Sequence, residues 1–198
     1  MTNPGPKITP QIDLRAKWAA IREQGDRPTC LACATSDAHE LHHQSAPLSA
    51  EYLFYHGVQQ AKGRDPLSDG LHFDEIAFAL RHNGQPAETD WPYTLVQANP
   101  WTPPGVGQLW HARLGHADIH PVVVISQYLR DGTPVILGLQ LSGSFVAPLP
   151  PSTTIDPGGP GFGGHAVLAV GLGHGPSGEI YFLIRNSWGD GWGDKGHA

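Results

Sequence analysis

Apolar residues recur at steps of three and four positions in the first half of the chain, a spacing that is typical of helices. The most regular run has apolar side chains at Leu31, Ala34, Ala38 and Leu41. No Gly or Pro interrupts this run before Gln44, so we predict a helix from Cys30 to Gln44. The residue before it, Thr29, is of a type that caps helix N-termini.

In the second half, short apolar runs bounded by turn residues replace this spacing and predict strands. The further elements expected are helices at about residues 50–60, capped by Ser49, 73–83 and 121–130, and strands at residues 135–141, 166–171 and 179–185. Helices precede strands, which predicts an α+β fold. We expect a single domain over residues 1–198, with a helical half at about residues 24–118. The sheet half should comprise about residues 119–198 plus the extended N-terminal segment.

The composition narrows the choice of partners and compartment. The net charge is −6 and there is no basic stripe, which argues against nucleic acid or an anionic membrane as a partner. No segment approaches the roughly 18 apolar residues of a membrane span. The first residues also lack the apolar core of a secretion signal. We therefore expect a cytoplasmic protein, or one exported by a route without an N-terminal signal.

The chain has two cysteines, Cys30 and Cys33. A pair this close in sequence can be a redox pair, but it cannot join distant parts of a fold, so the sequence demands no oxidising compartment. Helix geometry makes a disulfide between positions three apart awkward, and we expect Cys33 to be a packed core residue.

Cys30 stands at a predicted helix start, where unpaired backbone N–H groups and the helix dipole stabilise a thiolate. A thiolate nucleophile needs a base that can later act as an acid, and histidine titrates in the right range. That histidine needs a third group to hold its orientation. His165 follows Cys30 by 135 residues (165 − 30), and Asn186 follows it by 156 residues (186 − 30).

Three segments surround these residues: QGDRPTCLA at 24–32, GGHAVLAVG at 163–171 and IRNSWGDGWG at 184–193. The first resembles the segment of the papain family that holds the nucleophile, and the second resembles the strand that carries its histidine. The third is similar to the family's asparagine block almost residue for residue. Their order and gaps are close to the family's spacing of roughly 130–150 residues. The similarity covers about residues 13–198.

The resemblance implies a papain-like fold, with an active-site cleft between the helical half and an antiparallel sheet half. The cleft would take an extended peptide or protein substrate, with no metal and no organic cofactor. Cys30 would be the nucleophile, His165 the base and Asn186 the residue that orients it.

The same resemblance implies supporting roles. Gln24 would donate a hydrogen bond to the oxyanion, together with the backbone N–H of Cys30. Trp188 would shield the bond between the histidine and the asparagine from water. The substrate site would be lined by Gly70, Leu71, Gly164 and Trp188. Of these, Leu71 and Gly164 predict an open, apolar main pocket without built-in charge.

The chain departs from the family pattern at two places. Arg27 stands where the family has a disulfide-forming cysteine, and Leu31 replaces the aromatic residue that follows the nucleophile. The chain also ends twelve residues after Asn186 (198 − 186), where family members continue with a further strand. We therefore expect a truncated chain or part of a longer polypeptide. The open edge of the strand at 179–185 would then pair with the N-terminal segment, another chain or missing C-terminal residues.

Two other features have alternative interpretations. His39, His42 and His43 lie at i, i+3 and i+4, which can bind metal, but we expect an exposed polar face. The Gly- and Pro-rich stretch from Ser142 to Gly164 can be a lid over the site or an ordinary mobile loop.

The function expected from the sequence is that of a cysteine endopeptidase, which hydrolyses peptide bonds through a Cys-His-Asn triad and an acyl-enzyme. Two alternatives stay open. One is an acyl-transfer or glutamine-deamidating enzyme with the same triad. The other is an inactive binding module of papain fold.

Overall fold

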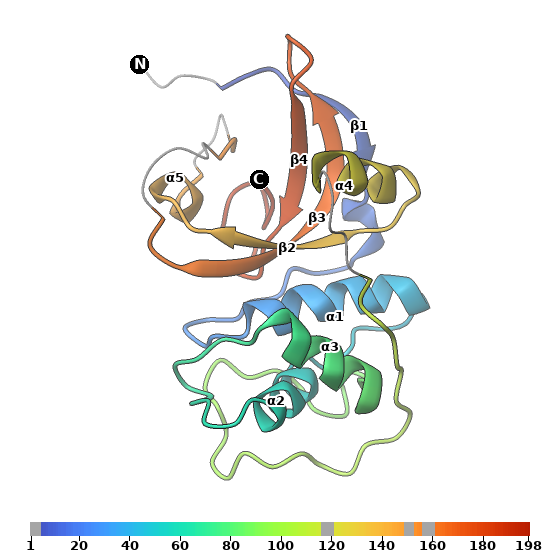
Figure 1. Ribbon diagram of the computed structural model, residues 1–198, viewed down its shortest axis with the longest axis vertical. Coiled ribbons are helices and arrows are strands. Elements are labelled where there is room, and N and C mark those ends of the chain that lie inside the picture. Colours follow the sequence, from blue (N-terminus) through green and yellow to red (C-terminus); the bar gives the residue numbers. More distant parts are fainter. Residues whose placement is uncertain (1–4, 116–120, 149–152, 156–160) are drawn as a thin grey trace. The chain divides into compact units, whose positions relative to one another are not determined.

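The computed structural model describes residues 5–115, 121–148, 153–155 and 161–198. Within these residues the chain forms two compact units, one of residues 24–116 and one of residues 1–23 with 117–198. The first unit contains helices and the second an antiparallel sheet, which confirms the α+β fold (Figure 1). In the described part of the chain, no helix has the length and apolar character that crossing a membrane requires.

The helical unit consists of three helices, α1 (Cys30–His43), α2 (Ala50–Gln60) and α3 (Phe73–His82). All three were predicted to within a residue of their ends. Both α1 and α3 pack against α2. Their contacts bury a core that includes Leu31, Leu48, Leu53, Phe54, Ile76 and Leu80.

The ends of these helices follow from local chemistry. Ser49 accepts a hydrogen bond from the backbone N–H of Tyr52 at 3.0 Å, which confirms it as a cap. Thr29 occupies the N-cap position of α1, as predicted, but its side chain makes no cap hydrogen bond. Its hydroxyl instead lies 2.7 Å from the phenol oxygen of Tyr93. After α3, Gly84 adopts a φ of +71°, where a side chain would be strained and would also meet the carbonyl of Trp110.

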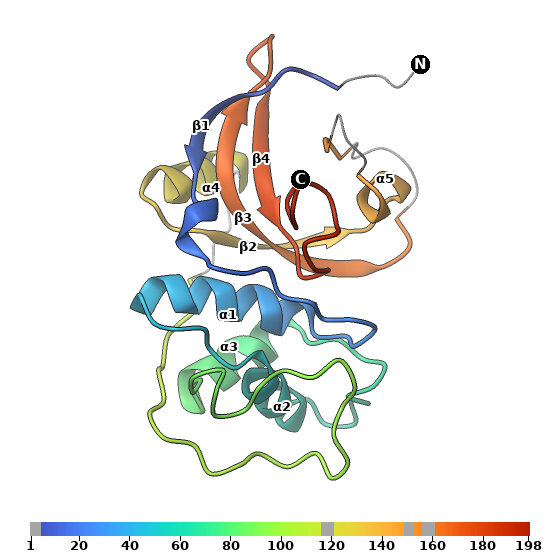
Figure 2. The same cartoon turned by 180° about the vertical axis from the view of Figure 1, so that it is seen from behind.

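The sheet unit is organised around one long strand, β3 (Gly164–His174). The other elements are β1 (Thr9–Asp13), a 3-10 turn η1 (Arg15–Lys17), α4 (Pro121–Arg130), β2 (Val135–Gln140), α5 (Gly143–Val146) and β4 (Ile180–Arg185). β3 pairs antiparallel with all three other strands, and Figure 2 shows β1 and β4 on either side of it. α4 packs against β3 and β2.

β3 is longer than predicted at both ends, since it begins at Gly164 and continues beyond Gly171 to His174. Glycine at 171 and 173 hid this extension in the sequence, since glycine disfavours strands on propensity alone. The sheet itself requires them. A side chain at Gly171 would lie 2.7 Å from the carbonyl oxygen of Ile12, and one at Gly173 would lie 2.6 Å from the side chain of Ile8. The close approach of β1 therefore depends on the two glycines.

The outer edge of β4 is partly covered by the last residues of the chain. The backbone N–H of Ile184 donates to Ala198 at 2.9 Å, and that of Asn186 donates to Gly196 at 3.0 Å. The N-terminal segment, one of the expected partners of this edge, pairs with β3 instead.

The expected exposed face of three histidines on α1 was wrong for one of them. His39 is only 3% exposed, and its Nδ1 lies 2.8 Å from the Oε1 of Gln85. The Nε2 of Gln85 donates to Ser36 and to the carbonyl of Ser49, so its oxygen must accept from His39. The periodicity of α1 gave no sign of this network, because most of the helix surface is buried.

The free energy of unfolding should decrease as the pH falls below about 6.5, because burial lowers the pKa of His39 from 6.5 to about 4. Between these values the unfolded chain binds a proton that the folded chain rejects, so the free energy of unfolding decreases as pH falls. The loss of unfolding free energy that His39 causes should be at most about 3 kcal/mol. Urea unfolding measured between pH 7 and pH 4 tests this.

The matched control is His39→Gln, which keeps an amide donor toward Gln85 and removes the titrating group. Burial also lowers the pKa of His56 and His165, so part of the dependence should remain in the variant. An identical pH dependence in both proteins would contradict the assignment to His39.

Candidate active site

The candidate nucleophile, Cys30, is the first residue of α1 and is partly exposed. The exposed fraction of Cys33 is 1%, which confirms the expectation of a packed core cysteine. The backbone N–H groups in the first turn of α1 have no earlier turn to bond to, and with the helix dipole they favour a negative charge at this end. The two thiols therefore have different environments, and Cys30 has the one that suits a nucleophile.

A buried hydrogen-bond network shapes the segment that leads into Cys30. The Nε2 of Gln24 donates to the carbonyl of Arg27 at 2.9 Å, and Gln24 is 7% exposed. The phenol of Tyr93 donates to the carbonyl of Gln24 at 2.8 Å. Because its one proton is used there, Tyr93 accepts from the hydroxyl of Thr29. Gly25 takes a φ of +60° between them, a conformation that favours glycine.

Arg27 forms a buried ion pair with Glu51 of α2, and the two are 5% and 2% exposed. Its Nη1 and Nη2 donate to the two carboxylate oxygens at 2.5 and 2.8 Å, and Nη1 also donates to the carbonyl of Thr94. The indole N–H of Trp101 donates to the same carboxylate at 2.7 Å. This bidentate arrangement ties three separate segments together. The sequence marked Arg27 as a departure but did not show its partner.

The residues expected to line the substrate site on this unit lie just before α3. Gly70 and Leu71 are both half-buried. The side chain of Leu71 packs against the backbone of Gly57 in α2, where a methyl group would collide with it. The backbone at Gly70 passes close to the carbonyl of Pro28, which lies 3.6 Å from the position of an added methyl group.

The sheet unit brings together His165 and Asn186. Nε2 of His165 lies 2.7 Å from Oδ1 of Asn186. The backbone N–H of Ser187 donates to the same atom at 2.9 Å, which identifies that atom as the oxygen. Since an amide oxygen only accepts, Nε2 of His165 must carry the proton. In the neutral ring, the lone pair then lies on Nδ1, and this nitrogen can act as a base.

Aromatic rings surround this pair. The ring of Trp188 lies 4.8 Å from that of His165, and the ring of Phe145 lies 5.4 Å from each of them. The indole N–H of Trp192 donates to the carbonyl of Phe145 and fixes α5 in place. Burial, opposed by the bond to Asn186, lowers the pKa of His165 and favours its neutral form.

Sequence reasoning identified Trp188 but missed Phe145 and its support by Trp192. The signal for Trp192 was its position in the asparagine block, whereas Phe145 lies in the Gly- and Pro-rich stretch without any motif. The rest of that stretch, at residues 149–152 and 156–160, lies outside the described residues. Gly164 opens β3 and is exposed, with nothing within 4 Å of the position of an added methyl group.

The described residues contain no group of three His, Cys, Asp or Glu side chains that could hold a metal ion. Of the three histidines on α1, His39 is committed to Gln85 and His42 is exposed.

The comparison with known proteins gives one consistent result. The model of the papain family of cysteine proteases matches residues 8–198. The chain belongs to the papain family. The sequence resemblance is thereby confirmed, and the papain-family assignment covers nearly the whole chain.

Individual relatives agree with the papain-family assignment. A cathepsin L-like peptidase of Aedes aegypti is 25% identical over 211 residues, which cover 97% of this chain and 58% of the relative. Cathepsin L1 of Drosophila melanogaster is 62% identical over 32 residues, or 16% of this chain and 9% of that protein. The chain thus spans less than two thirds of the length of these curated relatives.

A solved structure also matches the papain-family fold. The structure of xylellain, a cysteine protease from Xylella fastidiosa, superposes with a TM-score of 0.72 at 23% identity. The match covers 98% of this chain and 82% of xylellain.

We predict that Glu51→Gln will destabilise the protein, because it leaves the guanidinium of Arg27 buried without its counter-charge. Breaking a buried ion pair on one side costs about 3–5 kcal/mol. Urea unfolding of the variant should show a loss of this size.

The control is the double variant Arg27→Met with Glu51→Gln, in which no charge is left unpaired. It should be more stable than the single variant Glu51→Gln. If the single substitution costs less than about 1 kcal/mol, the ion pair is not an important anchor of the segment before Cys30.

Proposed function

We propose that this chain is a cysteine endopeptidase that works through Cys30, His165 and Asn186. The observation that carries the proposal is the bond from His165 to Asn186, which assigns the proton to Nε2 and leaves Nδ1 as a base. The position of Cys30 at the start of α1 adds support, since that is where a thiolate is stabilised.

In the proposed reaction, Nδ1 of His165 takes the proton of the Cys30 thiol, and Sγ bonds to the carbonyl carbon of a substrate amide. The negative charge that develops on the carbonyl oxygen is stabilised by the backbone N–H of Cys30 and the side-chain amide of Gln24. His165 then gives its proton to the leaving nitrogen as the C–N bond breaks, which forms an acyl-enzyme.

Water completes the cycle. His165 removes a proton from the water as it attacks the acyl carbon, and the proton returns to Sγ when the carboxylic acid leaves. Asn186 holds the ring through both steps, and Trp188 with Phe145 keeps bulk water away from the bond that holds it. No step requires a metal or organic cofactor.

Substitution of the nucleophile tests the mechanism. Cys30→Ala should lower peptide hydrolysis by at least about a thousand-fold with little effect on the fold, because it removes the group that forms the acyl-enzyme. Cys33→Ala is the matched control and should retain turnover. Intact mass after treatment with a thiol-reactive peptide epoxide should show one modification, which peptide mapping assigns to Cys30.

Retention of full activity by Cys30→Ala, or labelling of Cys33 instead, would refute the assignment. Ammonia release from a glutamine substrate without chain cleavage would show that the triad serves deamidation. A labelled but inactive protein would favour a binding module.

Substrate preference should follow from Leu71. This half-buried side chain rests on Gly57, so we expect peptides with an aliphatic or aromatic residue two positions before the cut to be favoured. One apolar contact is worth about 1–3 kcal/mol, or roughly 10–200-fold in kcat/KM. Leu71→Asp should shift a peptide-library profile toward Arg and Lys.

Leu67→Asp serves as the control, because Leu67 is 64% exposed and lies only four residues away. It should leave the profile unchanged. A wild-type profile dominated by Arg or Lys at that position would refute the role of Leu71 and leave the mechanism intact.

A further inference from the structure

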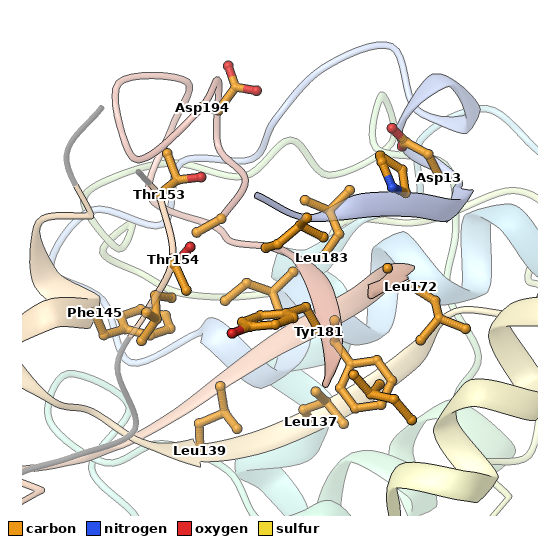
Figure 3. Close-up of a pocket in the computed structure, with 18 of the residues that line it drawn as sticks. Asp13, Leu137, Leu139, Phe145, Thr153, Thr154, Leu172, Tyr181, Leu183 and Asp194 are labelled. Carbon is orange, nitrogen blue, oxygen red and sulfur yellow. The ribbon is translucent and has the colours of Figure 1, made fainter. Parts of the chain in front are cut away.

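The helical unit holds a second sulfur group that the proposed hydrolysis does not use, the thiol of Cys33. A hollow of about 850 Å³ in the sheet unit offers no comparable group. Its lining is mainly apolar, as Leu137, Leu139 and Leu183 illustrate (Figure 3), and none of its described lining residues is a cysteine or a histidine. Cys33, in contrast, stands three residues after the proposed nucleophile on the same helix, α1. Both cysteines are in the thiol form, and the chain has no others.

The side chain of Cys33 points toward the start of α1. Helical side chains lean toward the N-terminus of their helix, and Sγ of Cys33 lies 3.9 Å from the hydroxyl oxygen of Thr29, the residue before Cys30. Thr29 is fully buried, and its own proton goes to the phenol of Tyr93, so its oxygen accepts the thiol proton of Cys33. The buried sulfur is therefore directed to the first turn of α1, where Cys30 lies.

Polar groups lie next to this sulfur. Burial works against the raised pKa of Arg27, and the side-chain bond to Glu51 is the largest cause that raises it. A negative charge on Cys33 is a further cause, so the guanidinium and the sulfur lie within reach of an electrostatic interaction. A cysteine in apolar surroundings is inert because burial disfavours its charged form. The cation of Arg27 opposes this effect and favours the thiolate, which is the form that attacks another sulfur.

The geometry of a helix start allows a bond between the two sulfur atoms. In a regular α-helix, Cα atoms three residues apart are separated by about 5 Å, inside the range of roughly 4.4–6.8 Å that disulfides span. The Cβ atoms, about 5–6 Å apart, must approach each other by about 1–2 Å. Inside a helix this movement disturbs the hydrogen bonds, which is why positions three apart pair awkwardly. Cys30 is the first residue of α1, and its backbone N–H lies outside the intrahelical bonds, so this turn can tighten.

We propose that Cys33 is a resolving thiol, with which Cys30 forms a reversible disulfide after oxidation by a peroxide. The inference rests on the proposed function, in which Cys30 supplies the thiolate. Sγ of Cys30 attacks one oxygen of the peroxide and the O–O bond breaks, so the sulfur becomes a sulfenic acid and the other oxygen leaves as water with the thiol proton. Sγ of Cys33 then attacks Sγ of Cys30. The S–O bond breaks, and the departing hydroxide takes the proton of Cys33 and leaves as a second water.

The disulfide stops hydrolysis and protects the nucleophile at the same time. No acyl-enzyme can form while Sγ of Cys30 is bonded to Cys33. Without a second thiol, the sulfenic acid is oxidised further to a sulfinic acid, which thiols do not reverse. A dithiol reductant, in contrast, restores both cysteines by exchange and is itself oxidised to a disulfide. Strain that remains in the turn makes this reduction easier.

The test is the mass of the reduced wild-type protein after treatment with hydrogen peroxide. We expect a single chain that is lighter by two hydrogen atoms, does not react with iodoacetamide, and returns to its starting mass with dithiothreitol. Because the chain has two cysteines, the loss of two hydrogen atoms from one chain identifies the bond. The tryptic peptide of residues 23–62, which holds both cysteines, is measured as well, so that oxidation of Met1 does not interfere.

Cys33→Ser is the matched control, since it keeps the size of the side chain and a proton for Thr29 but removes the second sulfur. Its Cys30 should end as a sulfinic acid that dithiothreitol does not reduce. After reduction, the wild type should recover at least about ten-fold more alkylatable Cys30 than the variant. The mass of the wild type decides by itself if the variant folds poorly.

Oxygen-containing products in the wild type, in the same proportion as in Cys33→Ser, would overturn the proposal. A disulfide formed only between two copies, seen as a doubled mass, would do the same, and so would two thiols that both survive the peroxide. The masses require no substrate, so the two proposals can be separated. An internal disulfide in a protein without peptidase activity would support the resolving role of Cys33 and count against the proposed function. Hydrolysis by a protein that gains only oxygen would support the proposed function and refute the resolving role.

Discussion

The proposed base, His165, must be protonated on the correct nitrogen and fixed in direction, and one hydrogen bond meets both requirements, while burial keeps the ring neutral. The bond from His165 to Asn186 works because Ser187 first fixes the orientation of the amide. The ring of Trp188 beside it lowers the local dielectric, which strengthens the bond and raises the cost of breaking it. β3 and the turn after β4 supply the two partners, so the sheet is the support on which this bond depends.

The helical unit also relies on buried polar contacts, which there hold the segment that leads into α1. The proposed nucleophile, Cys30, needs a rigid segment before the start of α1, and a disulfide is not available at Arg27. The bidentate ion pair of Arg27 with Glu51 joins the segment before Cys30 to α2. The phenol of Tyr93 bonds to both Gln24 and Thr29 and so links the two ends of that segment. Unlike a disulfide, these contacts do not change with the redox state of the surroundings. They depend instead on the counter-charge that Arg27 and Glu51 give each other, which makes them intolerant of single substitutions.

The sequence was informative where local chemistry decides structure. Helix ends depend on neighbouring residues such as Ser49 and Gly84, and the motifs that carry Cys30, His165 and Asn186 are contiguous. It was uninformative where partners lie far apart, as for Arg27 with Glu51 or His39 with Gln85. A buried polar residue resembles an exposed one until its partner is known, which is why His39 was assigned to a solvent face. Phe145 was missed because the Gly- and Pro-rich stretch around it shows neither helical nor strand periodicity.

The pair of His165 and Asn186 depends on β4 and on the residues that follow it. Asn186 follows β4 directly, and its backbone N–H bonds to Gly196 in the same tail that pairs with Ile184. Gly193 and Gly196 both adopt positive φ values in this tail, so its path is set by tight turns. The backbone N–H of Gly189 also donates to Arg22, which ties the loop after Asn186 to the N-terminal segment. Asn186 is therefore held from both sides, by the tail and by residues near the start of the chain. The residues that pair with β4 therefore also fix the amide that bonds to His165.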